Sequence, residues 1–261
     1  MKKVSICGKG GGGKSVVISL IASILVEEGY TVLAIDSDES NPGLYRMLGF
    51  ENPPRSIVDV DRSQAYLAPE FEEKHIRISD IPSEYLAEKG TLKLVVIGKI
   101  QQALEGCACV MGNIVRDLLS KLIVEDKEIV LVDTEAGVEH LGRGLEEYVD
   151  TVLLLVEPSF ESLALAEKAY GMVAKMDSAI QIWAVLNKIT SPEIENDLRE
   201  KLVKRNIKVA GVIHYDPQLY HDCWIGKPLG DSQAKQEARE IANFLLGKPG
   251  TNKVSPRRSS Q

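Results

Sequence analysis

Short runs of apolar, largely β-branched residues recur along the chain. Each run is continuously apolar rather than alternating, which is typical of strands that are buried on both faces of a sheet. The runs are residues 4–7, 31–35, 94–97, 129–132, 152–156, 182–186 and 209–213. Segments of helical length separate several of them, such as residues 15–28, 161–175 and 192–205. The alternation predicts an α/β fold in which helices flank a mostly parallel sheet of seven or more strands.

Two segments interrupt this alternation. Residues 51–91 contain a pair of prolines and a charged stretch without a clear period, so we interpret them as an irregular insertion that holds a helix or a hairpin. Residues 247–261 are polar, and a segment with so few apolar residues cannot bury enough surface to become ordered. The sequence therefore predicts one domain at residues 1–246, followed by a disordered tail.

Composition and charge indicate where the protein is located and which classes of partner it does not bind. The chain has 261 residues, of which 44% are hydrophobic, and a net charge of −7, which is unfavourable for binding to nucleic acid or anionic lipid. No apolar run approaches the ~20 residues that cross a bilayer. The glycine-rich residues 8–13 follow the charged start too soon for a signal peptide. We therefore expect a cytoplasmic protein that binds neither nucleic acid nor membrane and whose four cysteines form no disulfide framework.

The first apolar run ends in a glycine-rich loop. Residues 8–15 satisfy the phosphate-binding pattern G-x-x-x-x-G-K-[ST], between a predicted strand and a predicted helix. Glycines let several backbone N–H groups converge on a phosphate, and the helix that follows presents its positive end. Lys14 supplies a charge for the β- and γ-phosphates, and the Ser15 hydroxyl is a ligand for Mg²⁺. The sequence predicts a P-loop NTPase site for ATP or ADP, formed by Gly10, Gly11, Gly12, Gly13, Lys14, Ser15 and Val16.

This loop resembles the deviant Walker A motif of the ATPase class that includes MinD, ParA, ArsA and nitrogenase reductase. The mark of that class is a second lysine near the start of the loop, here Lys9. The resemblance implies that Lys9 crosses the interface of a homodimer to the nucleotide of the partner, so that ATP hydrolysis is slow and depends on dimerisation. A charge supplied from outside stabilises the transition state only when two subunits close. The alternative for Lys9 is a solvated loop lysine.

Polar residues follow three of the predicted strands. Asp36 and Asp38 follow the second strand, Asp133 follows the fourth, and Asn187 follows the sixth. An aspartate at the carboxyl end of such a strand reaches Mg²⁺, usually through water. The resemblance implies that Asp38 orients or deprotonates the attacking water, that Asp36 and Asp133 lie near Mg²⁺, and that Asn187 reads adenine. The alternatives are that both early aspartates only cap a turn and that Asn187 only ends a strand.

Cys107 and Cys109 form a C-x-C motif. Such a pair is weak evidence alone, because small buried cysteines are common. Gly106 and Gly112 bracket the motif, which favours an irregular, exposed segment. One motif supplies two thiolates, whereas soft-metal sites need three or four ligands, so two copies across a dimer axis would enclose one Ni²⁺ or Zn²⁺.

The C-x-C motif and residues 133–144 together resemble the CooC family, accessory ATPases that insert nickel into carbon monoxide dehydrogenase. This resemblance implies that Cys107 and Cys109 bind nickel, that nucleotide controls its uptake and release, and that the client is a nickel enzyme of that type. Gly12 departs from the family, in which most members have valine. Two alternatives stay open: a MinD- or ParA-like positioning ATPase, although the chain ends without a basic amphipathic helix, and an Mrp-like iron–sulfur carrier, although the chain has no C-x-x-C.

Overall fold

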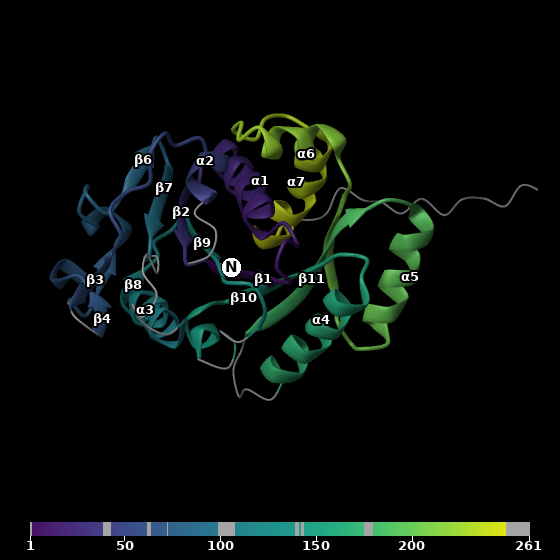
Figure 1. Ribbon diagram of the computed structural model, residues 1–261, viewed down its shortest axis with the longest axis horizontal. Helices are drawn as coiled ribbons and strands as arrows, with labels where there is room; N and C mark the ends of the chain where they lie inside the picture. Colours follow the sequence, from purple (N-terminus) through teal and green to yellow (C-terminus); the bar gives the residue numbers. More distant parts are fainter. Residues whose placement is uncertain are drawn as a thin grey trace, which may run out of the picture.

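An eight-stranded sheet organises the chain, in a computed structural model that describes residues 2–38, 43–61, 64–71, 73–98, 108–138, 141, 144–174 and 180–248 (Figure 1). The strand order is β12-β11-β10-β1-β9-β2-β7-β6, and every neighbouring pair is parallel except β6 and β7. The strands are β1 (Lys3–Gly8), β2 (Thr31–Asp36), β6 (Ala87–Lys89), β7 (Leu92–Val96), β9 (Glu128–Asp133), β10 (Thr151–Val156), β11 (Gln181–Ile189) and β12 (Val209–His214). The predicted mostly parallel α/β fold is confirmed. The short antiparallel strand β6 at one edge of the sheet was not predicted.

Helices cover both faces of this sheet (Figure 1). On one face lie α1 (Lys14–Glu27), α2 (Leu44–Met47) and α7 (Gln233–Leu245), and on the other lie α3 (Ala108–Lys121), α4 (Phe160–Val173) and α5 (Pro192–Val203). Alternate residues of a strand join different cores: in β2, Val32 packs with the α1 side and Leu33 with the α3 side. Both faces are therefore apolar, which explains why the predicted strands lacked an alternating pattern.

The segment at residues 51–91 packs against the core on the α3 side and ends in β6 at the edge of the main sheet. β3 (Val58–Asp61) and β4 (Gln64–Leu67) pair as an antiparallel hairpin, and β5 (Ile76–Arg77) pairs with β8 (Leu122–Ile123). In the described part of the chain, 3₁₀ turns occupy Pro69–Phe71, Ile78–Asp80 and, further on, Leu145–Tyr148. Phe71 and Tyr85 are fully buried here and meet edge to face, with ring centroids 5.3 Å apart. An aromatic pair thus anchors a segment in which the sequence shows no period.

The expectation of an irregular segment around the C-x-C motif is wrong from residue 108 onward. Helix α3 begins at Ala108, and Gly112 lies within it. Its later turns bury Ile114, Val115 and Leu118 in the core, and this burial offsets the roughly 1 kcal/mol that a glycine costs inside a helix. Among the described helices, none is long and apolar enough to cross a bilayer.

Candidate nucleotide-binding site

The glycine-rich loop joins the carboxyl end of β1 to the first turn of α1. Gly13 caps the helix in the left-handed conformation, with φ 91°, and its carbonyl accepts the Val17 N–H at 2.9 Å. The Gly12 N–H donates to the Lys9 carbonyl at 3.0 Å, which closes a tight turn inside the loop. The loop therefore ends in the first turn of a helix, where N–H groups and the helix dipole favour an anion.

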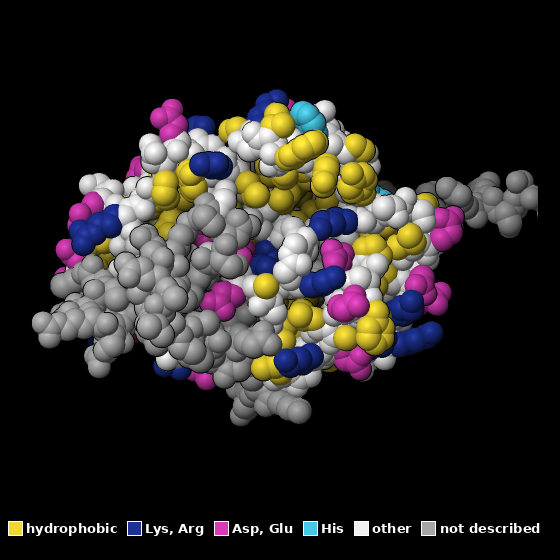
Figure 2. All heavy atoms as spheres, in the orientation of Figure 1, with side chains coloured by type: hydrophobic (Ala, Val, Ile, Leu, Met, Phe, Trp, Pro, Cys, Tyr) yellow, Lys and Arg dark blue, Asp and Glu magenta, His cyan; other side chains and the backbone are white. Residues whose placement is uncertain are grey.

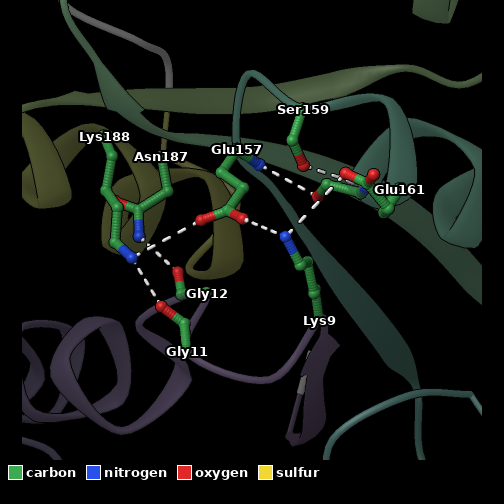
Figure 3. A network of polar contacts seen from close by, with 9 residues as sticks. Lys9, Gly11, Gly12, Glu157, Ser159, Glu161, Asn187 and Lys188 are labelled. Atoms are coloured by element: carbon green, nitrogen blue, oxygen red, sulfur yellow. Dashed lines mark hydrogen bonds and ion pairs between the residues drawn. The ribbon is translucent and has the colours of Figure 1, made fainter.

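Two residues at the end of β11 hydrogen-bond to the Gly11 and Gly12 carbonyl groups of this loop (Figure 3). The Asn187 side-chain amide donates to the Gly12 carbonyl at 2.8 Å, and the Lys188 ammonium donates to the Gly11 carbonyl. Lys188 has φ 59°, an uncommon conformation for a lysine. Because a carbonyl oxygen repels a phosphate, anchoring both oxygens favours a loop whose N–H groups face the anion.

Replacing Gly13 by alanine should damage both the fold and nucleotide binding. A Cβ atom at Gly13 would lie 2.7 Å from the Asn187 Nδ2 atom, and φ there is +91°. Left-handed backbone alone costs an alanine about 1–2 kcal/mol, and moving Asn187 would break its bond to Gly12. We expect urea unfolding to show a loss of about 2–3 kcal/mol, and a titration to show at least roughly tenfold weaker ATP binding.

The matched control for that substitution is Gly29→Ala. Gly29 also has positive φ, +81°, but a Cβ atom there meets nothing within 4 Å. The control should show the backbone cost and leave ATP binding intact. An equal loss of stability in both variants, with unchanged ATP affinity, would contradict the role of the contact between Gly13 and Asn187.

Three aspartates gather at the carboxyl ends of β2 and β9. Asp36 and Asp133 are register partners on these neighbouring strands, and the Asp38 N–H donates to Asp36 Oδ1 at 3.3 Å. All three are buried, together with Lys14 and Ser15 from the start of α1. Burial raises the pKa of Asp133 to about 7; the Ser15 hydroxyl and the Lys14 ammonium oppose the rise, and the Asp38 carboxylate adds to it. The structure thus brings together the predicted carboxylates and the end of the loop.

The surroundings of Asp133 fit a magnesium ion that arrives with a nucleotide. Neither of its carboxylate oxygens accepts a hydrogen bond of normal geometry from the described residues. The Ser15 hydroxyl lies close enough to favour the charged form, but a buried carboxylate so weakly hydrogen-bonded is unfavourable, and a cation or a cation-bound water would satisfy it. Within the described part of the chain, no three His, Cys, Asp or Glu side chains converge on one metal position. Mg²⁺ is usually held by one or two protein groups together with phosphates and water.

A pocket of about 270 Å³ lies beside the loop, and its walls are mainly apolar. Figure 2 shows hydrophobic side chains gathered over α6 (Pro217–Trp224), which forms one side of this pocket. Such walls suit the flat faces of a nucleobase next to the phosphate loop. The lining residues are Gly11, Gly13, Val16, Asn187, Lys188, Ile213, His214, Tyr215, Asp216, Leu219, Tyr220 and Cys223.

Lys9 points away from the loop and toward the end of β10 (Figure 3). Its ammonium lies 3.1 Å from Glu157 Oε1 and 4.0 Å from Glu161 Oε2. The Lys188 ammonium lies 3.4 Å from the other oxygen of Glu157. Lys9 and Lys188 therefore share the Glu157 carboxylate within a single chain.

With this geometry in place, comparison with known proteins identifies the family. Residues 4–222 match the family described as the CobQ/CobB/MinD/ParA nucleotide binding domain. The chain belongs to this family. It is thus a P-loop ATPase of the class that its deviant Walker A motif resembles.

Relatives of the chain in this family extend over most of its length. An uncharacterized ATP-binding protein of Methanocaldococcus jannaschii is 37% identical over 256 residues, which span 93% of this chain and 99% of the relative. The carbon monoxide dehydrogenase accessory protein CooC of Rhodospirillum rubrum is 33% identical over 206 residues, 73% of this chain and 75% of the relative. The fold is similar to that of the MinD cell division protein of Aquifex aeolicus, with TM-score 0.69 and 21% identity over 95% of this chain and 98% of that one.

Some features of the site lie beyond the sequence prediction or beyond the described residues. Cys107 lies outside the described residues, and of Cys109 only the backbone, in the first turn of α3, is described. The sequence analysis missed the contact of Glu157 with Lys9, and the pocket residues Tyr215 and Tyr220. The sequence carries only a partial signal: Glu157 and Tyr215 follow the carboxyl ends of predicted strands, the edge at which open α/β sheets bind ligands, but the order of the strands is not in the pattern.

Proposed function

We propose that this chain is an ATP-dependent metallochaperone, which works as a homodimer and loads nickel into an enzyme of the carbon monoxide dehydrogenase type. The observation that carries the proposal is the 33% identity with CooC, in a chain that also has the C-x-C motif. The fold alone does not choose among the activities of the family. The cysteine pair favours metal carriage over the positioning of cell structures.

Each residue of the nucleotide site has a proposed task. Gly10, Gly11, Gly12 and Gly13 surround the phosphates and bind them through backbone N–H groups other than that of Gly12, which donates to the Lys9 carbonyl, and the Lys14 ammonium neutralises charge on the β- and γ-phosphates. Val16 and Asn187 lie in the pocket proposed for the base. The Asn187 amide already donates to the Gly12 carbonyl, so we propose that its remaining acceptor and donor read adenine.

Magnesium and hydrolysis involve the buried carboxylates. Ser15, Asp36 and Asp133 would hold Mg²⁺ directly or through water, and the ion would neutralise the charge that develops on the phosphates. Asp38 orients or deprotonates the attacking water. Lys9 reaches the nucleotide of the partner when two subunits close, so hydrolysis is slow in a single chain.

Metal binding is proposed at the contact between the two subunits. Cys107 and Cys109 from both chains supply four thiolates, the number that closes a soft-metal site, with nickel as cargo and zinc as the competing ion. The exposed apolar surface beside the nucleotide pocket supports an interface on this face: Trp224 is 80% exposed, and Tyr220 and Ile225 are also exposed. We propose that closure with ATP assembles the metal site and that hydrolysis loosens it.

A nickel titration with ATP tests this function. The reduced wild-type chain should bind about one Ni²⁺ per two chains, and the variant Cys107→Ala/Cys109→Ala should bind none at that site. The control His75→Ala removes an exposed potential metal ligand outside both the motif and the nucleotide pocket, and this variant should bind nickel like the wild type. Equal nickel binding by the double variant would remove the metal proposal. A brown protein with acid-labile sulfide after anaerobic purification would instead indicate an iron–sulfur carrier.

A further inference from the structure

Glu157 pairs through its carboxylate with both Lys9 of the phosphate loop and Lys188 of β11 (Figure 3). Its carboxylate lies 3.1 Å from the Lys9 ammonium through one oxygen and 3.4 Å from the Lys188 ammonium through the other. The Glu157 side chain is 17% exposed, whereas that of Glu161, which is 4.0 Å from Lys9, is 69% exposed. Glu157 is thus the better shielded partner of Lys9, and its ion pair is less screened by solvent.

Hydrogen bonds to the start of α4 fix the backbone that carries Glu157. Glu157 follows β10 directly, and its N–H donates to the Ser162 hydroxyl at 3.1 Å. The Ser162 N–H in turn donates to the Ser159 hydroxyl, which caps α4. β10 pairs with β1 in parallel, so the residue after β10 and the loop after β1 emerge at the same edge of the sheet. Glu157 therefore meets Lys9 on a rigid support rather than by a chance surface contact.

We infer that Glu157 is a positioning residue that holds Lys9 inside its own chain until a second subunit closes. This inference rests on the proposed function, in which Lys9 must reach the nucleotide of the partner. The Lys9 ammonium is turned toward Glu157 at the end of β10, so its side chain must leave this position before it extends to a phosphate of another chain. Each dimer that forms must therefore break two such ion pairs, one in each subunit. Glu157 sets the concentration of ATP-bound chain at which dimers appear.

Lys188 remains a partner of Glu157 after Lys9 has left. Its ammonium is shared between Glu157 and the Gly11 carbonyl of the loop. When Lys9 leaves, Glu157 keeps Lys188 as its partner, so the carboxylate is not left unpaired. The loop carbonyl stays anchored while Lys9 becomes available. The arrangement thus releases one lysine without disturbing the phosphate loop.

The first test measures the reactivity of Lys9 in the nucleotide-free chain. Limited acetylation followed by mass spectrometry reports how readily each lysine amine reacts, and an ion-paired ammonium reacts slowly. In Glu157→Gln, Lys9 should react about two- to fivefold faster, the range of a partly exposed ion pair. The matched control Glu161→Gln makes the same charge change four residues away and should have little effect. Lys201, which pairs with Asp197, should react equally in all three chains.

The second test measures assembly by sedimentation with ATP, in an Asp38→Ala background that preserves the nucleotide. Because two ion pairs break per dimer, Glu157→Gln should lower the dimer dissociation constant by the square of the effect per chain, about 4- to 25-fold. Equal acetylation of Lys9 with and without Glu157 overturns the positioning role, whether or not dimers form. Faster acetylation with an unchanged dimer constant also overturns it. If neither chain dimerises at saturating ATP, the proposed dimeric function falls, and this role of Glu157 falls with it.

Discussion

Asp133→Asn should remove the part of the pH dependence that Asp133 gives to the free energy of unfolding of the nucleotide-free protein between pH 5 and pH 8. In the wild type, burial raises the pKa of Asp133 to about 7, above the ordinary value of 3.8. Between these values the unfolded chain has lost the proton and the folded chain still holds it, so the wild-type stability falls as the pH rises. One pKa unit corresponds to about 1.4 kcal/mol, which gives a fall of about 2–3 kcal/mol between pH 5 and pH 8 relative to Asp133→Asn.

Urea unfolding of both chains at pH 5 and pH 8, without nucleotide or Mg²⁺, measures this difference. Other titrating groups are common to both chains and cancel in the comparison. The control Asp126→Asn changes a fully exposed aspartate and should show the pH dependence of the wild type. Parallel pH profiles of the wild type and Asp133→Asn would contradict the raised pKa.

The same substitution should remove most ATP hydrolysis. Asparagine keeps the shape of Asp133 but not the charge that a magnesium ion needs beside Ser15. We expect a loss on the order of 100-fold at saturating ATP, the size seen when one preorganised electrostatic group is removed. A chain that is more stable at pH 8 and nearly inactive would mean that this buried carboxylate is kept for chemistry at the expense of stability. Unchanged hydrolysis would exclude Asp133 from the magnesium site.

The sequence was sufficient for the parallel strands and for the loop because both signals are local. Continuous apolar runs mark strands that are buried on both faces, and the spacing from Gly8 to Ser15 marks the loop. β6 was missed because its three residues, Ala87 to Lys89, are partly or fully exposed at the sheet edge and have no hydrophobic pattern. α3 was missed because Gly112 suggested a break, whereas the helix is stabilised by the burial of its later turns.

Contacts within the site needed the order of the strands. Glu157 and Lys9 are 148 residues apart in sequence, and they meet because β10 is the neighbour of β1. Asn187 reaches Gly12 because β11 comes next in the sheet. Sequence patterns indicate which residues end a strand, but not which strands are neighbours. The direction of the Lys9 side chain in a single chain was therefore outside what the motif could predict.

The two lysines of the loop should separate binding from assembly when each is replaced by alanine. Lys14 is 6% exposed and lies among the buried aspartates, so Lys14→Ala should weaken ATP binding by about 10- to 100-fold even in dilute, monomeric protein. The Lys9 ammonium pairs with Glu157 rather than facing its own loop, so Lys9→Ala should leave monomer binding within roughly twofold. At high protein concentration, Lys9→Ala should lower the rate of ATP hydrolysis by about 10³-fold, the size of effect seen when a charge supplied by a partner is removed.

Titration with a fluorescent ATP analogue at low protein concentration and hydrolysis at high concentration measure the two effects separately. Lys93→Ala, which removes a lysine paired with Glu88 far from the loop, should change neither quantity. If Lys9→Ala weakens monomer binding as much as Lys14→Ala, Lys9 serves its own nucleotide. A second subunit would then have no essential part in hydrolysis. If Lys9→Ala binds ATP normally, unlike Lys14→Ala, and still fails to hydrolyse ATP at high concentration, the Lys9 charge acts after binding, as expected for a lysine supplied by a partner.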